Sequence, residues 1–147
     1  MFSEKINGNE EIVRAIENYD HSVETEEIGK LLCAFVERMM QGGTALVGTV
    51  GNDDPEEDGA AERGLSYAYI YAAEMNSMLA IAFTDEDELK KAYCEDYEET
   101  TWEELFRTVE ADSHFGGVLI NGGGKRLIMV KEMLHDTLQI LQDLKNE

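Results

Sequence analysis

Apolar residues along the first forty positions recur at steps of three and four, which is the period of an amphipathic helix. Asn9 is a good N-cap for a first helix in this region. The apolar face of that helix would hold Ile12, Val13 and Ile16. A second helix is predicted to begin near Ser22 or Thr25 and to end at Gly42-Gly43, because glycine accepts the left-handed conformation that closes helices. Its buried stripe would comprise Ile28, Leu31, Leu32, Phe35, Val36 and Met39.

After position 43 the apolar period falls to two residues, which is typical of strands. The pattern predicts strands over 44–50, 66–73 and 78–83, with the second and third antiparallel across a short turn. The third strand is apolar almost throughout, which indicates a central position with burial on both faces. One face of the second strand carries three tyrosines, namely Tyr67, Tyr69 and Tyr71.

Helix signals return after the third strand. Thr84 and Asp85 are N-cap residues with acidic residues three positions later, a capping-box arrangement that predicts a short helix through Leu89. A further helix is expected to begin near Thr101. Its inward side chains would be Trp102, Leu105, Phe106 and Val109.

The C-terminal third contains two short apolar runs, 117–120 and 127–130, followed by a helical pattern over 131–144. A glycine-rich turn joins the two runs. The order of elements predicts an α+β fold in a single domain over 1–147. Its sheet would be mixed, mostly antiparallel and of about five strands, with N-terminal, inserted and C-terminal helices.

Charge narrows the classes of partner. The 147 residues carry a net charge of −20, and 43% of them are hydrophobic, which is enough for a core. Nucleic acid and anionic membranes are not expected as partners, because both require a basic surface. The chain contains no apolar run of membrane-spanning length, and the polar N-terminus lacks a signal-peptide pattern. We therefore expect a cytoplasmic protein, in which Cys33 and Cys94 are reduced.

Two segments concentrate the acidic residues. Residues 53–62 hold six acids and no base, and residues 85–104 hold ten acids and two lysines. Such clustering can steer a basic partner, so the first segment is a candidate partner-binding surface. Its candidate residues are Asp53, Asp54, Glu56, Glu57 and Asp58. One alternative is a solvated surface that keeps copies of the protein apart. Another is weak binding of divalent ions by the loop, although not as an EF-hand, because Leu65 occupies the position of the bidentate glutamate.

The turn after residue 120 is the second candidate partner-binding surface, through Asn121, Lys125 and Arg126. With Lys131 it forms the main basic island of an acidic chain, which suits a small anion or an acidic partner. A phosphate-binding P-loop is excluded, because no glycine stands at the required position and Arg126 replaces the expected Ser or Thr. The alternative is an ordinary hairpin connection.

No pattern of catalytic or metal-binding residues is present. The three histidines are far apart, and no zinc-binding spacing or nucleophile elbow occurs. Cys33 lies within an apolar stripe and is expected in the core. Acidic neighbours should raise the pKa of Cys94 and keep its thiol unreactive. We therefore expect no enzyme, no cofactor and no metal.

Three segments resemble the N-terminal domain of the SseB family (enhanced serine sensitivity protein B) of bacteria. Residues 79–85 resemble its apolar strand ending in Phe-Thr-Ser/Asp, and residues 117–121 resemble its Gly-apolar-apolar-apolar-Asn-Pro turn. The return strand 126–130 also fits. Gly122 stands where the family has proline, which loosens the turn. The resemblance implies a bacterial cytoplasmic domain without established catalytic residues.

These observations favour a non-catalytic, acidic protein-interaction or regulatory module with an unidentified protein partner. One alternative is a binding protein for a small, amino-acid-related metabolite. Another is an immunity or antitoxin protein that neutralises a basic toxin. Tyrosines can also serve an interface, so the tyrosine face either contacts a partner or packs under helices with its hydroxyls at the rim. A homo-oligomer is compatible with all of these.

Overall fold

The computed structural model describes residues 8–18, 25–49, 67–73, 75–92, 94, 96–124 and 126–146. Its helices are α1 (Glu10–Asn18), α2 (Thr25–Met40), α4 (Glu86–Lys91), α5 (Trp102–Ala111) and α6 (Lys131–Lys145). Its strands are β1 (Thr44–Gly48), β2 (Tyr69–Ala72), β3 (Ser77–Phe83), β4 (Tyr97–Thr101), β5 (Phe115–Ile120) and β6 (Leu127–Val130).

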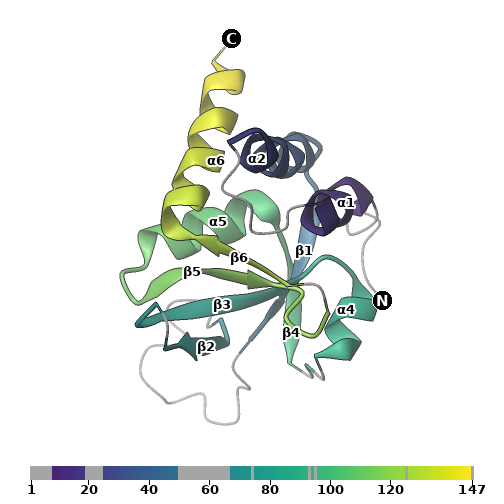
Figure 1. The fold of residues 1–147 in the computed structure, drawn as a ribbon, viewed down its shortest axis with the longest axis vertical. Helices are drawn as coiled ribbons and strands as arrows, with labels where there is room; N and C mark the ends of the chain where they lie inside the picture. The colour runs from purple at the N-terminus through teal and green to yellow at the C-terminus, as the bar shows by residue number, and fades with distance from the viewer. Residues whose placement is uncertain are drawn as a thin grey trace.

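The strands form one mixed sheet in the order β4-β1-β3-β5-β6, with β2 paired to β3 (Figure 1). Only the β3–β5 pair is parallel; every other pair is antiparallel. The predicted α+β fold and mostly antiparallel sheet are therefore confirmed. The central position of β3 is also confirmed, since it pairs with β1, β2 and β5.

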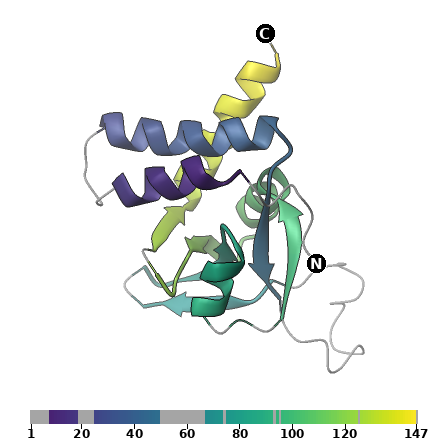
Figure 2. The same ribbon diagram turned by 90° about the vertical axis from the view of Figure 1, so that its right-hand side faces the viewer.

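Helices cover the two faces of the sheet unequally. Side chains from α1, α2, α5 and α6 pack on one face in a continuous core around the edge-on pair Phe35 and Trp102, whose ring centroids lie 5.1 Å apart. The opposite face carries a small separate cluster of Leu46, Phe83 and Leu89, supplied by β1, β3 and α4. Figure 2 shows α1 and α2 stacked on one side of the sheet and α4 on the other. One side of the sheet is thus thickly covered and the other thinly.

Several predicted boundaries agree with the structure. Asp85 caps α4, because its side chain accepts a hydrogen bond from the Glu88 backbone N–H at 2.9 Å. Gly42 has a φ of 73° just after α2, as a helix-closing glycine should. Thr101 caps α5 through the Glu104 N–H at 3.1 Å.

The predicted count of about five strands missed β4, so the sheet has six strands. Its sequence, YEETT, lacks the alternation of apolar and polar residues that predicts a strand, and the apolar pattern gives it no element. The segment forms a strand because it pairs along the whole of β1, from Thr44 opposite Thr101 to Gly48 opposite Tyr97. An edge strand needs only one buried face, and charged side chains are common there.

Candidate functional site

Six of the eight predicted site residues, Asp53, Asp54, Glu56, Glu57, Asp58 and Lys125, lie outside the described residues. The flanks of the acidic segment are described, however. Thr49 and Tyr67 form an isolated antiparallel bridge, and the Ala68 N–H donates to the Gly48 carbonyl at 2.9 Å. The acidic segment therefore leaves and rejoins the described fold at one place, beside the start of β2.

Strand β2 is the most exposed apolar element in the described part of the chain. The exposed fractions of Tyr69, Ile70 and Tyr71 are 53%, 43% and 57%. The strand pairs with β3 along one edge only. The interpretation that the tyrosines pack under helices is thus wrong for Tyr69 and Tyr71, because both are more than half exposed. It is right for Tyr67, which belongs to the main core. The Tyr69 ring meets Phe115 of β5 edge-on, with ring centroids 6.5 Å apart.

Two glutamates, Glu98 and Glu104, lie near Tyr67 on the helix-covered face. Glu98 is opposite Val47, a residue of that face's core, and Tyr69 is opposite Ala80 of the same core. Burial raises the pKa of Glu98, and the neighbouring Glu104 carboxylate raises it further. Neither glutamate forms an ion pair with a described lysine or arginine. We call Tyr69, Ile70, Tyr71, Glu98 and Glu104 the β2 surface.

The hydroxyl of Tyr67 lies at the base of this surface. Burial raises the pKa of Tyr67 to about 12. The hydroxyls of Thr108 and Thr100 oppose this increase, whereas the carboxylates of Glu104 and Glu98 add to it. The oxygen is fully buried and has no well-formed hydrogen bond to any described residue. An unpaired hydroxyl in such a position lowers the stability of the folded protein.

The opposite end of β3 contains a buried polar cluster that the sequence did not indicate. The Asn9 side-chain amide donates to the carbonyls of Thr44 and Thr84 at 2.9 and 2.8 Å. Its oxygen accepts from Arg38 Nε at 2.9 Å and from Trp102 Nε1 at 3.2 Å. Asn9 therefore joins α1, α2, β1, β3 and α5. It stands at the predicted position just before α1, where its carbonyl accepts from the Val13 N–H at 3.0 Å, while its side chain bonds these distant groups. We call this cluster the Asn9 junction.

Asn121 is one of two predicted site residues that the structure describes; it is buried and extends the junction. Its oxygen accepts from the Thr84 N–H at 3.0 Å, and its amide donates to Thr84 Oγ1 at 3.1 Å. Thr84 Oγ1 lies 3.0 Å from Asp85 Oδ2, to which it can donate. With a φ of 57°, Asn121 makes the sharp turn that leaves β5. Asn121 therefore holds the ends of β3 and β5 together and offers no exposed group to a partner.

The glycine turn is packed against α4. A Cβ on Gly123 would lie 2.8 Å from the Lys91 carbonyl carbon, and one on Gly124 would lie 2.6 Å from Glu88 Oε1. The absence of side chains thus permits close approach of two backbones. Of the basic residues near the turn, Arg126 is exposed. Lys131 instead donates to the Asp112 carbonyl at 2.8 Å, so these two described basic side chains do not act as one exposed group.

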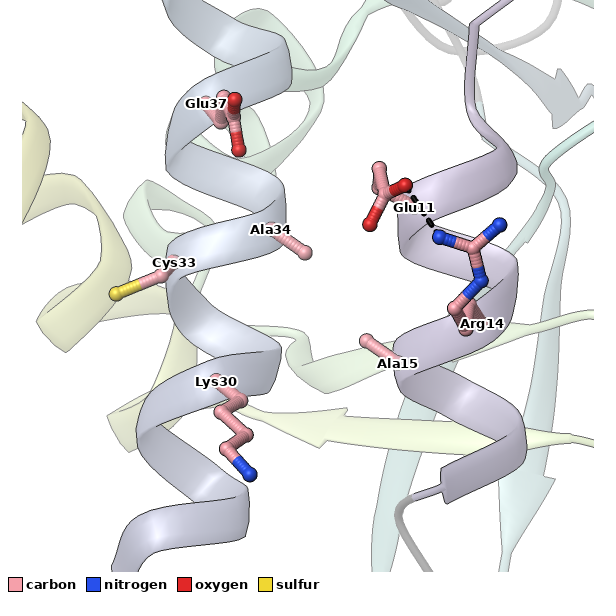
Figure 3. A pocket seen from close by; sticks show the side chains of 7 residues that line it. All are labelled: Glu11, Arg14, Ala15, Lys30, Cys33, Ala34 and Glu37. Atoms are coloured by element: carbon pink, nitrogen blue, oxygen red, sulfur yellow. Dashed lines mark hydrogen bonds and ion pairs between the residues drawn. The ribbon is translucent and has the colours of Figure 1, made fainter.

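Two clefts border helix α1. The smaller, of 390 Å³, lies beside the Asn9 junction and is lined mainly by α1 together with Thr84 and Asp85. The larger, of 560 Å³, lies between α1 and α2. Figure 3 shows Ala15 and Ala34 facing each other across it, with the Glu11–Arg14 ion pair on one wall and Cys33 directed away. Charged, water-accessible walls and a narrow alanine floor give this cleft little apolar area for a ligand.

The two described histidines each bond a carboxylate. His114 and His135 are exposed and bond the carboxylates of Asp112 and Glu110, at 2.9 and 3.0 Å, and neither contacts a nucleophile. Burial raises the pKa of the Cys94 thiol, and the negative charge of Asp96 raises it further, which is the expected direction. Cys33 is exposed, so its predicted core position is wrong.

The described residues contain no cluster of three or more His, Cys, Asp or Glu side chains placed to hold a metal ion. None of the described helices is long and apolar enough to cross a membrane. No family model, curated protein or solved structure matches this chain.

Proposed function

We propose that this protein is a non-catalytic, acidic interaction module of the SseB N-terminal type, acting in the cytoplasm, which binds a protein partner through the β2 surface. The observation that carries the proposal is the run of three consecutive large side chains, Tyr69, Ile70 and Tyr71, exposed along one strand. Tyr69 and Tyr71 project from one face of the strand and Ile70 from the other, so both faces of β2 present exposed apolar side chains, which commonly mark an interaction site. Tyrosine suits this use, because its ring gives apolar contact and its hydroxyl remains hydrated.

The charge of the chain supports a basic partner. Glu98 and Glu104 lie near Tyr67, just before β2, and the acidic segment 53–62 is attached to the fold at the start of β2. Complementary charge raises association rates and excludes acidic competitors. The segment residues Asp53, Asp54, Glu56, Glu57 and Asp58 are thereby proposed to steer the partner toward β2.

A tagged capture from the source organism's lysate at moderate salt tests the proposal. The wild type is compared with a Tyr69→Thr/Tyr71→Thr variant, in which threonine preserves strand propensity. Met40→Ser/Leu144→Ser is the matched control, since these residues are 57% and 40% exposed on other elements. We expect a partner that the wild type and control retain and the tyrosine variant loses. Equal recovery by all three proteins would contradict the assignment of β2.

A third variant locates the contribution of the acidic segment. Changing Asp53, Asp54, Glu56, Glu57 and Asp58 to the corresponding amides should weaken capture at low salt more than at high salt, because steering is screened by ions. A partner lost from this variant at every salt concentration would instead make the segment itself the contact surface. If the partner proves to be a basic toxin, the module is an immunity or antitoxin protein.

The 390 Å³ cleft beside the Asn9 junction favours a second candidate function, the binding of a small amino-acid-related metabolite. Thr84 and Asp85 follow the carboxyl end of β3, which runs parallel to β5, and ligands often bind at such strand ends. A thermal-shift screen of amino acids distinguishes the two functions. A ligand at about 100 times its Kd should stabilise the protein by about 2.7 kcal/mol. If no amino acid raised the unfolding temperature, metabolite binding at this cleft would be rejected.

A further inference from the structure

Strand β2 has an outer edge with no described pairing partner. Along residues 69–72 it pairs only with β3. The Ala68 N–H points the other way, toward the Gly48 carbonyl at the end of β1. Because N–H groups of alternate residues in a strand point to the same edge, the Ile70 N–H is directed away from β3 as well. An unpaired edge of this kind can accept an additional strand.

The side chains beside this edge define the charge of what could pair there. Tyr67, Tyr69 and Tyr71 alternate along one face, and Glu98 and Glu104 lie next to Tyr67. The two carboxylates repel each other and have no ion-pair partner among the described lysines and arginines. The buried Tyr67 hydroxyl is likewise unpaired in the described structure. A cationic side chain placed here would meet two carboxylates and the exposed rings of Tyr69 and Tyr71.

We propose that an extended segment of the partner protein adds to the outer edge of β2 as an antiparallel strand and places a lysine or arginine beside Glu98 and Glu104. This inference rests on the proposed interaction function and specifies how the partner is recognised. Backbone pairing through Ile70 supplies affinity, and alternate side chains supply selectivity. Lysine or arginine alternating with apolar residues is the pattern that fits a strand with acidic and aromatic groups on one face.

Two other occupants have the wrong charge. The chain's own segment 53–62 contains six acids and no base, so pairing it here would add negative charge beside Glu98 and Glu104. A second copy would bring another −20 charges and a second pair of unneutralised glutamates. Like charges placed together across an interface oppose association. A basic partner segment has no such penalty.

The test uses full-length protein and a fluorescent eight-residue probe peptide of alternating lysine and valine, with binding followed by anisotropy. Two control peptides have glutamate in place of lysine, or proline in place of a central valine. We expect the lysine peptide to bind wild type and both controls to fail, because proline cannot complete a strand ladder. Ile70→Pro should weaken binding at least about tenfold, whereas Ile70→Thr, which keeps the N–H, should stay within about threefold.

Several results would overturn strand addition. One is equal binding of the proline-interrupted peptide, which decides the matter even if Ile70→Pro does not fold. Another is lysine-peptide binding that is unchanged by Glu98→Gln/Glu104→Gln. A dimer in sedimentation that Ile70→Pro dissociates would make a second copy the occupant and would also overturn it. A lysate partner lost by Tyr69→Thr/Tyr71→Thr but kept by Ile70→Pro would leave the interaction module intact and reject only this mode of binding.

Discussion

The two ends of strand β3 meet very different surroundings. At its carboxyl end, Thr84, Asn121 and Asn9 are buried, and every one of these polar side chains has a hydrogen-bond partner. At its amino end, the paired strand β2 exposes Tyr69 and Tyr71 and leaves one backbone edge without a described partner. A satisfied buried network holds elements together, whereas an exposed apolar strand gains by being covered. We infer that stability resides at the first end and binding at the second.

The largest effect is expected from Asn9→Ala. The change removes four hydrogen bonds and leaves buried donors on Arg38 and Trp102 without their acceptor. Each unsatisfied buried group costs about 1–3 kcal/mol, so the free energy of unfolding should fall by about 3 kcal/mol or more. Urea unfolding measures this loss, with the exposed neighbour Glu10→Ala as control. If binding resides at the amino end of β3, the Asn9→Ala variant still captures the partner at a low temperature at which it is folded. Loss of capture by the folded variant would contradict this separation of stability from binding.

A smaller loss of stability is expected at the glycine turn. Gly123→Ala places a Cβ against the Lys91 and Ala92 backbone at 2.8–2.9 Å, and backbone cannot move aside cheaply. Overpacking of this kind costs about 1–3 kcal/mol. At Gly122 the nearest atom is a Leu119 side-chain carbon at 3.0 Å, which can shift. The midpoint temperature of thermal unfolding should therefore be clearly lower for Gly123→Ala than for Gly122→Ala. Equal midpoint temperatures would argue against close packing between the turn and α4.

The sequence predicted the elements well where period and capping agree. It placed β3, α5, β5, β6 and α6 correctly, because apolar spacing determines these segments locally. The sequence pattern did not predict the Asn9 junction, because the hydrogen-bond partners of Asn9 are distant in sequence, at positions 38, 44, 84 and 102. One signal was available: Arg38 follows Phe35 by three residues and therefore lies on the apolar stripe of α2.

The candidate site was less predictable than the fold. Cys33 lies four residues from both Gly29 and Glu37, so helical spacing could have placed it on the exposed side with them. The exposure of β2 has no comparable signal, since Tyr69, Ile70 and Tyr71 are apolar on both faces and would suit a buried strand equally well. Exposure there follows from which helices cover the sheet, and this is a tertiary property.

The tyrosines should contribute little to stability. Tyr69→Thr and Tyr71→Thr remove side chains that are more than half exposed, and threonine retains strand propensity. We expect Tyr71→Thr to alter the free energy of unfolding by less than about 0.5 kcal/mol, as is usual for surface positions. Tyr69→Thr also removes the edge-on contact with Phe115 and should cost about 1 kcal/mol or less. Denaturant titration of the same preparations used for capture measures this. A loss comparable with that of Asn9→Ala would mean that β2 is a structural element and would remove the contrast between the two ends.

The smallest expected effect is a pH-dependent increase in the free energy of unfolding of the Glu98→Gln variant. Burial and Glu104 raise the pKa of Glu98 in the folded protein, so the folded state holds this proton more tightly than the unfolded state. That contribution to stability is present below the unfolded value of about 4.3 and is lost as the pH rises through the folded pKa. The variant should therefore be more stable than wild type at pH 7, by less than about 0.5 kcal/mol because of screening. Glu37→Gln is the control; a gain of the same size at pH 3.5 would contradict the assignment.

The most direct test of the division between the two ends is amide hydrogen exchange of the full-length protein, alone and with its captured partner. The account predicts that the partner slows exchange across β2, including Ile70, and leaves Thr84 and Asn121 at the Asn9 junction unchanged. Protection confined to the junction and its neighbouring cleft, with β2 exchanging as fast as in the free protein, would contradict it.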